Sequence, residues 1–555
     1  MTGGPMRTRS YRKIGGLALT AAVVWSVGAA AQTTPGQVVD TLKQPPPLQS
    51  HPEVVPVWQP SSAPPGVAGS NRRITVSRFD FAGNTLFSNR ELQGIVADYT
   101  NRPVTLLELY AAADRIAAFY VDRGYSLASV NVPPQKIEDG AVLLQISEGR
   151  IAKVDVDNAR LYRPQQIRRE LPDVQPGTIY NGDIFRDGLR QLNTLPGLQA
   201  RAILKPGDEY GTSDMIVRVN EKPFAASAAI DNFGRENTGE FRLSATATLN
   251  NPLRIEDQFN VIGLVSEDHL LRYAYVDYSL PVSRVGTRLK AAYSDAEFDV
   301  DHAPIDGRNR RGELSVEQTL FAGSRDFIKL SGGVSRTESN ADFTSAPRIR
   351  FISTKITLFE LGALWNHSYA NAAVSQISTS VSSNFSRATR AELVAASGDD
   401  PASDQRLRWE LDAQHLQPLP AQLQLLLHLN GVYSPDPLVD TEAYSLGGPN
   451  TVRGFPAAEV RGDRGYFGSL TLRRPVFVGD AQFAGRVFFD AGKVFAVDPL
   501  PGSPDHESLT STGLGIDLAW WHLNARLDWS FPLDNRDVSD GHDRSRLFGT
   551  LAIAF

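Results

Sequence analysis

Residues 523–531 read Leu523-Asn524-Ala525-Arg526-Leu527-Asp528-Trp529-Ser530-Phe531, and polarity changes at every step. Side chains of a β-strand point alternately to opposite faces, so a period of two predicts a strand with one apolar and one polar face. Residues 406–413 repeat the pattern, with Leu407, Trp409, Leu411 and Ala413 alternating with charged residues. Alternation alone also fits a half-buried soluble sheet. The number of strands and the last strand are needed to choose between the two.

Runs of this kind fill the chain from about residue 223 to residue 555. We count about sixteen, starting near residues 224, 240, 257, 271, 285, 310, 326, 351, 371, 404, 420, 464, 481, 509, 521 and 545. An even number of antiparallel strands closes a barrel with both chain ends on one side. Closure is required in lipid, where an unpaired backbone group costs several kcal/mol. We therefore predict an all-β transmembrane barrel over 222–555, with a polar, wet lumen.

The last residues support the membrane interpretation. Leu547, Gly549, Leu551, Ile553 and the terminal Phe555 share one face of the final run. A last strand that ends in Phe resembles the signal by which the barrel-assembly machinery recognises outer-membrane barrels. We expect Phe555 to serve as that signal.

The first residues predict export from the cytoplasm. Arg7, Arg9, Arg12 and Lys13 precede an apolar run over 14–27, and Ala29-Ala30-Ala31 follows it. This order is typical of a signal peptide, here 1–31, cleaved after Ala31. A retained anchor is the alternative, but the run is shorter than the roughly 20 residues that a membrane helix needs.

Overall composition excludes some partners and bonds. The chain has no Cys, so no disulfide stabilises it in an oxidising compartment. Its net charge is −6, with no basic tract beyond the first residues, and no nucleic acid is expected as a partner.

Three segments precede the predicted barrel. Residues 32–73 are rich in Pro, Gln and Ser and predict a periplasmic linker with a short helix near 37–42. Residues 74–149 and 150–221 each predict a small α+β unit, read in the first as β-α-α-β-β. Two helices would cover one face of each sheet and leave an edge strand free. A free edge can accept a partner strand, or it can face only solvent or a neighbouring domain.

Several short segments carry a family resemblance in this order along the chain. They are Asp122-Arg123-Gly124-Tyr125 with Val132-Pro133-Pro134, Pro206-Gly207-Asp208-Glu209-Tyr210-Gly211, Asp231-Asn232-Phe233-Gly234 with Thr238-Gly239, and Asn251-Pro252-Leu253 with Asp257. The chain resembles the TpsB transporters of two-partner secretion, haemolysin/haemagglutinin secretion-activation proteins whose outer-membrane barrel follows POTRA domains. The resemblance implies that 74–149 and 150–221 are POTRA 1 and POTRA 2.

The most specific segment is Gly447-Gly448-Pro449-Asn450-Thr451-Val452-Arg453-Gly454-Phe455. It is similar to the loop that folds back into the barrel in this superfamily, and we expect such a loop around 445–462. The resemblance implies that Val452, Arg453, Gly454 and Phe455 form a latch whose partner is the strand motif Phe488, Asp490 and Gly492. A bidentate arginine–carboxylate pair is strong and directional. A static structural ion pair is the alternative.

The resemblance also implies a mechanism. The POTRA units would capture an unfolded, secreted partner exoprotein of the TpsA-like, β-helical type, and the lumen would export it. The segment 35–44 would plug the resting barrel.

Alternative functions are an outer-membrane insertase, which the same plan would serve, and a passive porin, which would leave residues 74–221 unused. An enzyme is a weaker alternative, because the nine His show no metal-ligand spacing and no nucleophile motif is present. We expect no catalytic residue, no metal and no cofactor.

Overall fold

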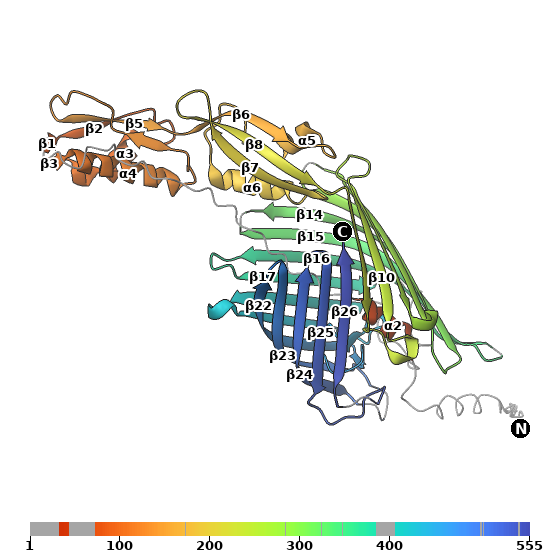
Figure 1. The fold of residues 1–555 in the computed structure, drawn as a ribbon. Helices are drawn as coiled ribbons and strands as arrows, with labels where there is room; N and C mark the ends of the chain where they lie inside the picture. Colours follow the sequence, from red (N-terminus) through yellow and green to blue (C-terminus); the bar gives the residue numbers. More distant parts are fainter. Residues whose placement is uncertain are drawn as a thin grey trace, which may run out of the picture.

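The computed structural model describes residues 33–43 and 73–555, apart from 172–173, 284, 324, 347, 385–405, 500–501, 503 and 542–543. Two small α+β units lie at one end of a large barrel (Figure 1). The predicted signal peptide, 1–31, and most of the predicted linker, 32–73, lie outside the described residues.

Sixteen antiparallel strands form a closed barrel, which confirms the predicted fold class. They are β9 (Phe224–Asp231), β10 (Arg242–Asn250), β11 (Gln258–Ser266), β12 (Leu271–Pro281), β13 (Thr287–Asp299), β14 (Ile305–Ala322), β15 (Asp326–Phe343), β16 (Ile349–Ser368), β17 (Val374–Asn384), β18 (Arg406–Pro418), β19 (Gln424–Tyr433), β22 (Arg464–Val478), β23 (Ala481–Phe495), β24 (His506–Trp520), β25 (Leu523–Pro532) and β26 (Arg546–Ala554). Strand β26 pairs with β9 and closes the ring.

The alternating residues divide between the two faces of the barrel wall. Leu527 and Trp529 are 44% and 50% exposed on the outside, whereas Asp528 and Ser530 are 3% and 0% exposed. The exposed apolar face is the one that lipid covers, and the polar side chains therefore face the lumen.

The first α+β unit contains β1 (Arg73–Val76), β2 (Arg78–Ala82), α3 (Asn89–Ile95), β3 (Arg102–Thr105), α4 (Leu106–Val121), β4 (Ser129–Asn131) and β5 (Ala141–Ser147). Its three-stranded sheet has the order β2-β5-β4. The prediction for this unit missed β3, a four-residue strand that contains Pro103 and pairs with β1. Such a short run before a helix carries too little alternation to be recognised.

The second unit contains β6 (Arg150–Asp157), α5 (Pro164–Arg169), α6 (Gly182–Leu192), β7 (Leu198–Pro206) and β8 (Thr212–Glu221). Its sheet has the order β6-β8-β7, with the same parallel and antiparallel pairing as β2-β5-β4. Apolar residues such as Met215, Val217 and Leu192 fill the space between sheet and helices. The unit therefore has its apolar side chains inside, whereas the barrel has them on its outer face.

Each unit fixes one loop with a glutamate at the end of its central strand. Glu148 accepts hydrogen bonds from the backbone N–H groups of Thr85 and Leu86 at 2.6 and 2.8 Å. Glu221 accepts three from residues 160–162, at 2.6 to 3.0 Å. In both units a carboxylate at the end of the central strand accepts backbone N–H groups of a loop. The similarity of the two units therefore includes this contact as well as the order of their helices and strands.

A separate helix, α2 (Pro35–Leu42), lies within the barrel beside the strands (Figure 1). Thr34 caps it, with Gln37 completing the capping box, and Pro35 occupies the first turn, where a missing N–H costs nothing. Among the helices of the described residues, none is long and apolar enough to cross a membrane. Short 3-10 turns are η2 (Ala97–Tyr99), η3 (Glu236–Thr238), η4 (Glu267–His269), η5 (Pro420–Gln422) and η6 (Asp440–Glu442).

Candidate functional site: the lumen, its loop and its helix

The long connection between β19 and β22 folds into the barrel. It contains η6 and a two-stranded sheet of β20 (Tyr444–Leu446) and β21 (Val460–Gly462). At the turn after β20, Gly447 and Gly448 have φ angles of 111° and 96°, which only glycine adopts without strain. Thr451 closes this turn, since its hydroxyl accepts the Gly447 N–H at 2.9 Å. The turn places Arg453 against the barrel wall.

Arg453 is bound to the wall by several polar contacts. Its Nε and Nη2 each donate to one oxygen of Asp490 on β23, both at 2.7 Å. Nη2 also donates to Ser469 on β22 at 3.1 Å, and Ser469 donates to Asp490 at 2.7 Å. The guanidinium lies over the ring of Phe488, 3.5 Å from its centroid. Geometry of this kind gives a strong and directional pair.

The other predicted latch residues pack around this pair. Val452 and Phe455 are completely buried in an apolar cluster with Leu446 and Val494. A methyl group added at Gly492 would lie 2.7 Å from Leu446 Cδ1, so the strand is glycine there because the loop approaches closely. The structure thus brings the predicted loop residues and the predicted strand residues together.

The burial of the Arg453–Asp490 pair determines how much stability is lost when one partner is removed. Asp490 has no exposed surface, and the Arg453 side chain is 9% exposed. Removing one member of a buried ion pair leaves an uncompensated charge and costs about 3–5 kcal/mol. The loop base is therefore fixed to the wall as long as both residues are present.

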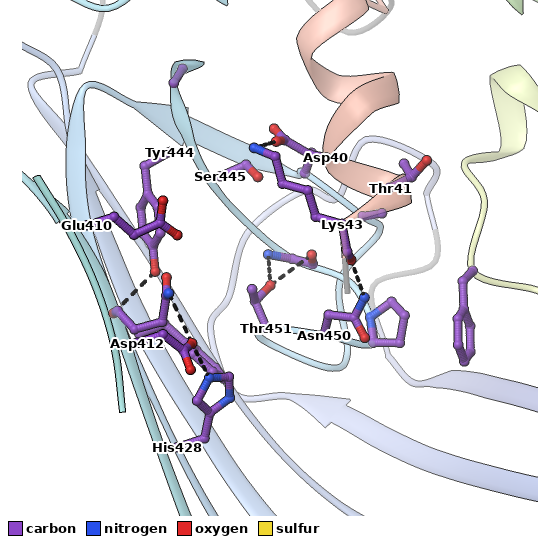
Figure 2. A pocket seen from close by; sticks show the side chains of 18 of the residues that line it. Asp40, Thr41, Lys43, Glu410, Asp412, His428, Tyr444, Ser445, Asn450 and Thr451 are labelled. Atoms are coloured by element: carbon purple, nitrogen blue, oxygen red, sulfur yellow. Dashed lines mark hydrogen bonds and ion pairs between the residues drawn. The ribbon is translucent and has the colours of Figure 1, made fainter. Parts of the chain in front are cut away.

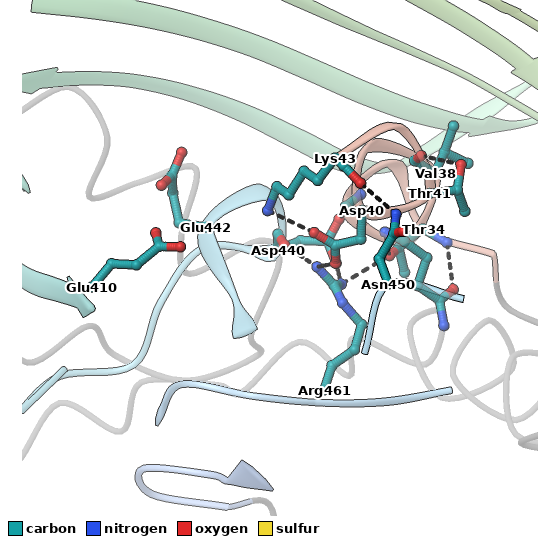
Figure 3. Close-up of polar contacts among 12 residues, drawn as sticks. Thr34, Val38, Asp40, Thr41, Lys43, Glu410, Asp440, Glu442, Asn450 and Arg461 are labelled. Carbon is teal, nitrogen blue, oxygen red and sulfur yellow. Dashed lines mark hydrogen bonds and ion pairs between the residues drawn. The ribbon is translucent and has the colours of Figure 1, made fainter. Parts of the chain in front are cut away.

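A second polar cluster joins the loop to α2, as Figure 3 shows. Arg461 on β21 donates to the Asp440 carboxylate and to the Thr34 hydroxyl, the latter at 3.2 Å. Its Nη2 lies 3.3 Å from Asp40 of α2. Asp440 in turn accepts the backbone N–H of Gly36 at 2.6 Å. These contacts hold the first turn and the acidic side chain of the helix against the loop.

Further contacts hold α2 against other parts of the barrel. The side chain of Asn450 donates to the carbonyl oxygen of Lys43 at 2.8 Å. Arg242 on β10, paired with Asp231 at 2.7 Å, donates to the carbonyl oxygen of Thr41 at 2.9 Å. Val38 is buried among residues of β12, β13 and β14. The helix therefore touches both the loop and the barrel wall.

A cavity of about 330 Å³ lies between the helix, the loop and the barrel wall (Figure 2). Its lining includes Asp40, Lys43, Glu410, Asp412 and His428. His428 lies 2.7 Å from Asp412, and Lys43 lies 2.7 Å from Asp40. Charged and hydroxyl groups from three separate parts of the chain thus line the space next to α2, and an extended polypeptide would meet hydrogen-bonding groups there.

The predicted POTRA residues lie at the boundary between the two units. The carbonyl oxygen of Gly124 accepts the N–H of Gly182 at the start of α6, at 2.7 Å. The hydroxyl of Tyr210 accepts a hydrogen bond from Asn131 of β4 at 2.6 Å. Two segments that lie far apart in the sequence therefore both connect the units.

The remaining residues of these two segments make contacts within their own units. Asp122 ends α4, with its N–H donated to Ala118, and Arg123 lies over the Phe119 ring at 3.5 Å. Tyr125 packs against Tyr120. Asp208 accepts a hydrogen bond from Lys153 at 3.0 Å, and the carbonyl oxygen of Glu209 accepts the hydroxyl of Thr212 at 2.7 Å.

Phe555 lies at the seam of the barrel. Its N–H donates to Ala226 of β9 at 2.8 Å, and its ring stacks on His522 at 5.2 Å. The side chain is 64% exposed. The last residue of the chain is therefore accessible.

Sequence reasoning missed the residues that bind α2. Gly36 and Asp440 are separated by 404 positions, and Arg461 lies within the predicted loop around 445–462 but was given no role. Asp231 stood in a quoted segment, but its role beside Arg242 was not foreseen. Within the described ranges, no group of three metal-ligating side chains comes together.

Residues 211–518 match the family described as haemolysin secretion/activation protein ShlB/FhaC/HecB, and 74–149 match the ShlB-type POTRA domain. The chain is 25% identical to the outer membrane transporter CdiB of Escherichia coli O6:K15:H31 over 70% of its length and 67% of that protein. It is also 25% identical to the haemolysin transporter protein ShlB of Serratia marcescens, over 84% and 83% of the two chains.

The solved structure of CdiB from Escherichia coli matches 94% of this chain and 96% of its own, with a TM-score of 0.67 and 22% identity. That likeness concerns the fold. The family match covers more than half of the 555 residues. The chain therefore belongs to the haemolysin secretion/activation protein family of the two-partner secretion transporters.

Proposed function

We propose that this outer-membrane transporter captures an extended exoprotein with its periplasmic POTRA units and passes it through the barrel lumen after α2 has left. The observation that carries the proposal is a closed barrel whose polar lumen holds a helix bound by side-chain contacts. Such contacts can break one by one, whereas the wall is a continuous ladder of strands. The proposal assigns the chain no enzymatic activity.

Capture would use free strand edges. Strand β7 pairs only with β8 among the described strands, so its other edge has no strand partner there. A nine-residue edge can bind an extended segment through main-chain hydrogen bonds, which makes few demands on sequence. Tyr210 and Gly124 would keep the edges of the two units in a fixed relation.

Passage needs no nucleotide in this proposal. The passenger would fold outside the cell, and net folding free energies of about 5 to 15 kcal/mol would favour outward movement. A β-helical passenger suits this, since repeats can fold one after another as they emerge. We further propose that the barrel-assembly machinery inserts the transporter through its Phe555 strand.

A cross-link tests whether α2 must move. The chain has no Cys, so Lys43→Cys and Asn450→Cys would introduce the only two thiols. Because Asn450 contacts the Lys43 carbonyl, a short cleavable bis-maleimide can join the two positions. We expect export of the exoprotein to stop on cross-linking and to return on cleavage, while each single-cysteine variant exports normally.

Two outcomes would contradict the proposal. Export at the normal rate through the cross-linked protein would show that α2 stays in place. Loss of porins from the outer membrane, with the exoprotein still exported, would indicate an insertase.

A further inference from the structure

A groove of about 470 Å³ lies between the second POTRA unit and the periplasmic turns of the barrel. Arg163, the residue before α5, and Arg169, the last residue of α5, line it on the POTRA side. Leu253, Arg254 and Ile255 line it from the β10–β11 connection, and Val282 from the β12–β13 turn. We name these six residues the joint groove.

The apolar side of the joint groove is exposed. Leu253, Ile255 and Val282 are 65%, 48% and 54% exposed. In β12, Asp277 and Ser279 face the lumen at 7% and 9% exposure, and the same alternation would put Val282, the residue after the strand, on the outer side. The groove therefore presents exposed apolar side chains at the end of the barrel that meets the POTRA unit.

The other side of the joint groove carries positive charge. Within the described residues, the exposed guanidinium groups of Arg163 and Arg254 make no ion pair. Arg169 is paired with Glu256, which also lines the groove, at 2.6 Å, and with Glu170 at 3.0 Å. Two arginines are thus available for an external anion, beside a third that is already paired with two carboxylates.

We propose that the joint groove binds the phosphate group of a phospholipid from the periplasmic leaflet. Arginine binds phosphate through a planar fork of donors, and the neighbouring apolar side chains would contact the acyl chains. The charge favours a phosphate at this depth, and the exposed apolar surface favours a lipid over a free anion.

A bound lipid would join the POTRA unit to the barrel. The two parts already meet here, because Gln166 donates to the carbonyl oxygen of Arg254 at 3.3 Å and Arg169 pairs with Glu256. A phosphate held by Arg163 of one part and Arg254 of the other would reinforce this joint. The inference is independent of what the barrel exports.

The test uses the full-length protein in detergent, with bound lipid counted by native mass spectrometry. Phosphatidylglycerol is compared with diacylglycerol of the same acyl chains, and inorganic phosphate serves as competitor. The double variant Arg163→Gln/Arg254→Gln is compared with Arg90→Gln/Arg201→Gln, which removes two exposed arginines outside the groove. We expect each groove arginine to account for a roughly five-fold change in phosphatidylglycerol affinity.

Three results would overturn the proposal. They are equal binding of phosphatidylglycerol and diacylglycerol, equal loss in the control variant, and full displacement by inorganic phosphate, which would indicate a free-anion site. If the double variant does not fold, the single variant Arg254→Gln is measured instead. Unchanged phosphatidylglycerol affinity in that single variant would also overturn the proposal.

Discussion

Two arginines of the same inward loop are bound in different ways. Arg453 meets both oxygens of Asp490, a wall residue with no exposed surface, and Ser469 supports the pair. Arg461 meets Asp440 of its own loop and two residues at α2, Thr34 and Asp40. The contacts with Thr34 and Asp40 measure 3.2 and 3.3 Å, against 2.7 Å for both bonds between Arg453 and Asp490.

The difference lies in what each arginine joins and how closely. Arg453 joins the loop to a continuous strand ladder through a bidentate pair with a carboxylate that has no exposed surface. Arg461 joins the loop to a separate helix through longer contacts, and longer hydrogen bonds are weaker. We infer that the first contact maintains the resting architecture and the second can open.

Arg453→Ala breaks the buried contact with the barrel wall and should have the largest effect. It leaves the Asp490 carboxylate buried without a counter-charge, and we expect the barrel to lose about 3–5 kcal/mol of stability. The temperature at which the protein loses its folded mobility in SDS gels measures this. Arg526→Ala is the control, because Arg526 is 51% exposed in its pair with Asp517. Equal melting of the two variants would refute the assignment.

Arg461→Ala breaks the contact between the loop and α2. Charge-assisted hydrogen bonds contribute about 1.5–3 kcal/mol each, so about 2 kcal/mol should be lost from the closed state while the barrel stays folded. That corresponds to a roughly thirty-fold rise in the open fraction. Single-channel recordings in planar bilayers measure it. Melting as low as that of Arg453→Ala would mean that the two contacts do not differ.

Glu148 extends the comparison to a buried carboxylate outside the membrane. Burial raises its pKa, but hydrogen bonds from Thr85, Leu86 and Tyr120 outweigh this and hold the pKa below its ordinary value of 4.5. A lowered pKa gives stability that is present above pH 4.5 and is lost as pH falls through the folded value.

Hydrogen exchange of the Thr85 and Leu86 amides in the intact protein measures this loop. We expect protection to decline below pH 4.5 in the native protein. Glu148→Gln should reduce protection at neutral pH by about 1.5 kcal/mol, because one acceptor oxygen is lost. Protection that does not change with pH would contradict the role of the carboxylate.

Gly36→Ala tests the same α2 contact through sterics. A methyl group there would overlap the carbonyl oxygen of Asp440 and the guanidinium of Arg461. Overpacking of this kind costs about 1–3 kcal/mol, so α2 should shift out of place. Thr41→Cys, the only thiol in such a variant, should then react faster with a maleimide. Gly94→Ala is the matched control, because a methyl group there meets nothing within 4 Å.

Ser469→Ala should have the smallest effect. It removes one neutral partner of Arg453 and Asp490 but leaves the ion pair in place. We expect a loss of about 1 kcal/mol in the melting assay and unchanged channel activity. A larger loss than in Arg453→Ala would mean that the serine, and not the ion pair, secures the loop.

The sequence by itself determined the strands and their faces. Alternation is a local property, and the predicted starts near 224, 271, 326, 464 and 481 lie within one residue of β9, β12, β15, β22 and β23. The starts predicted near 310 and 420 were wrong by five and four residues, since β14 begins at Ile305 and β19 at Gln424. The resemblance singled out Arg453 and Asp490, because both stand in recognisable segments.

Only the tertiary structure decided which polar lumen residues meet. Asp440 and Arg461 lie in the inward loop between β19 and β22, outside the barrel strands, so the alternation of those strands says nothing about them. Barrel closure and loop folding bring Gly36 beside Asp440, 404 positions away, and Arg163 beside Arg254. A contact between such distant positions depends on how the whole barrel closes, and no local pattern encodes it.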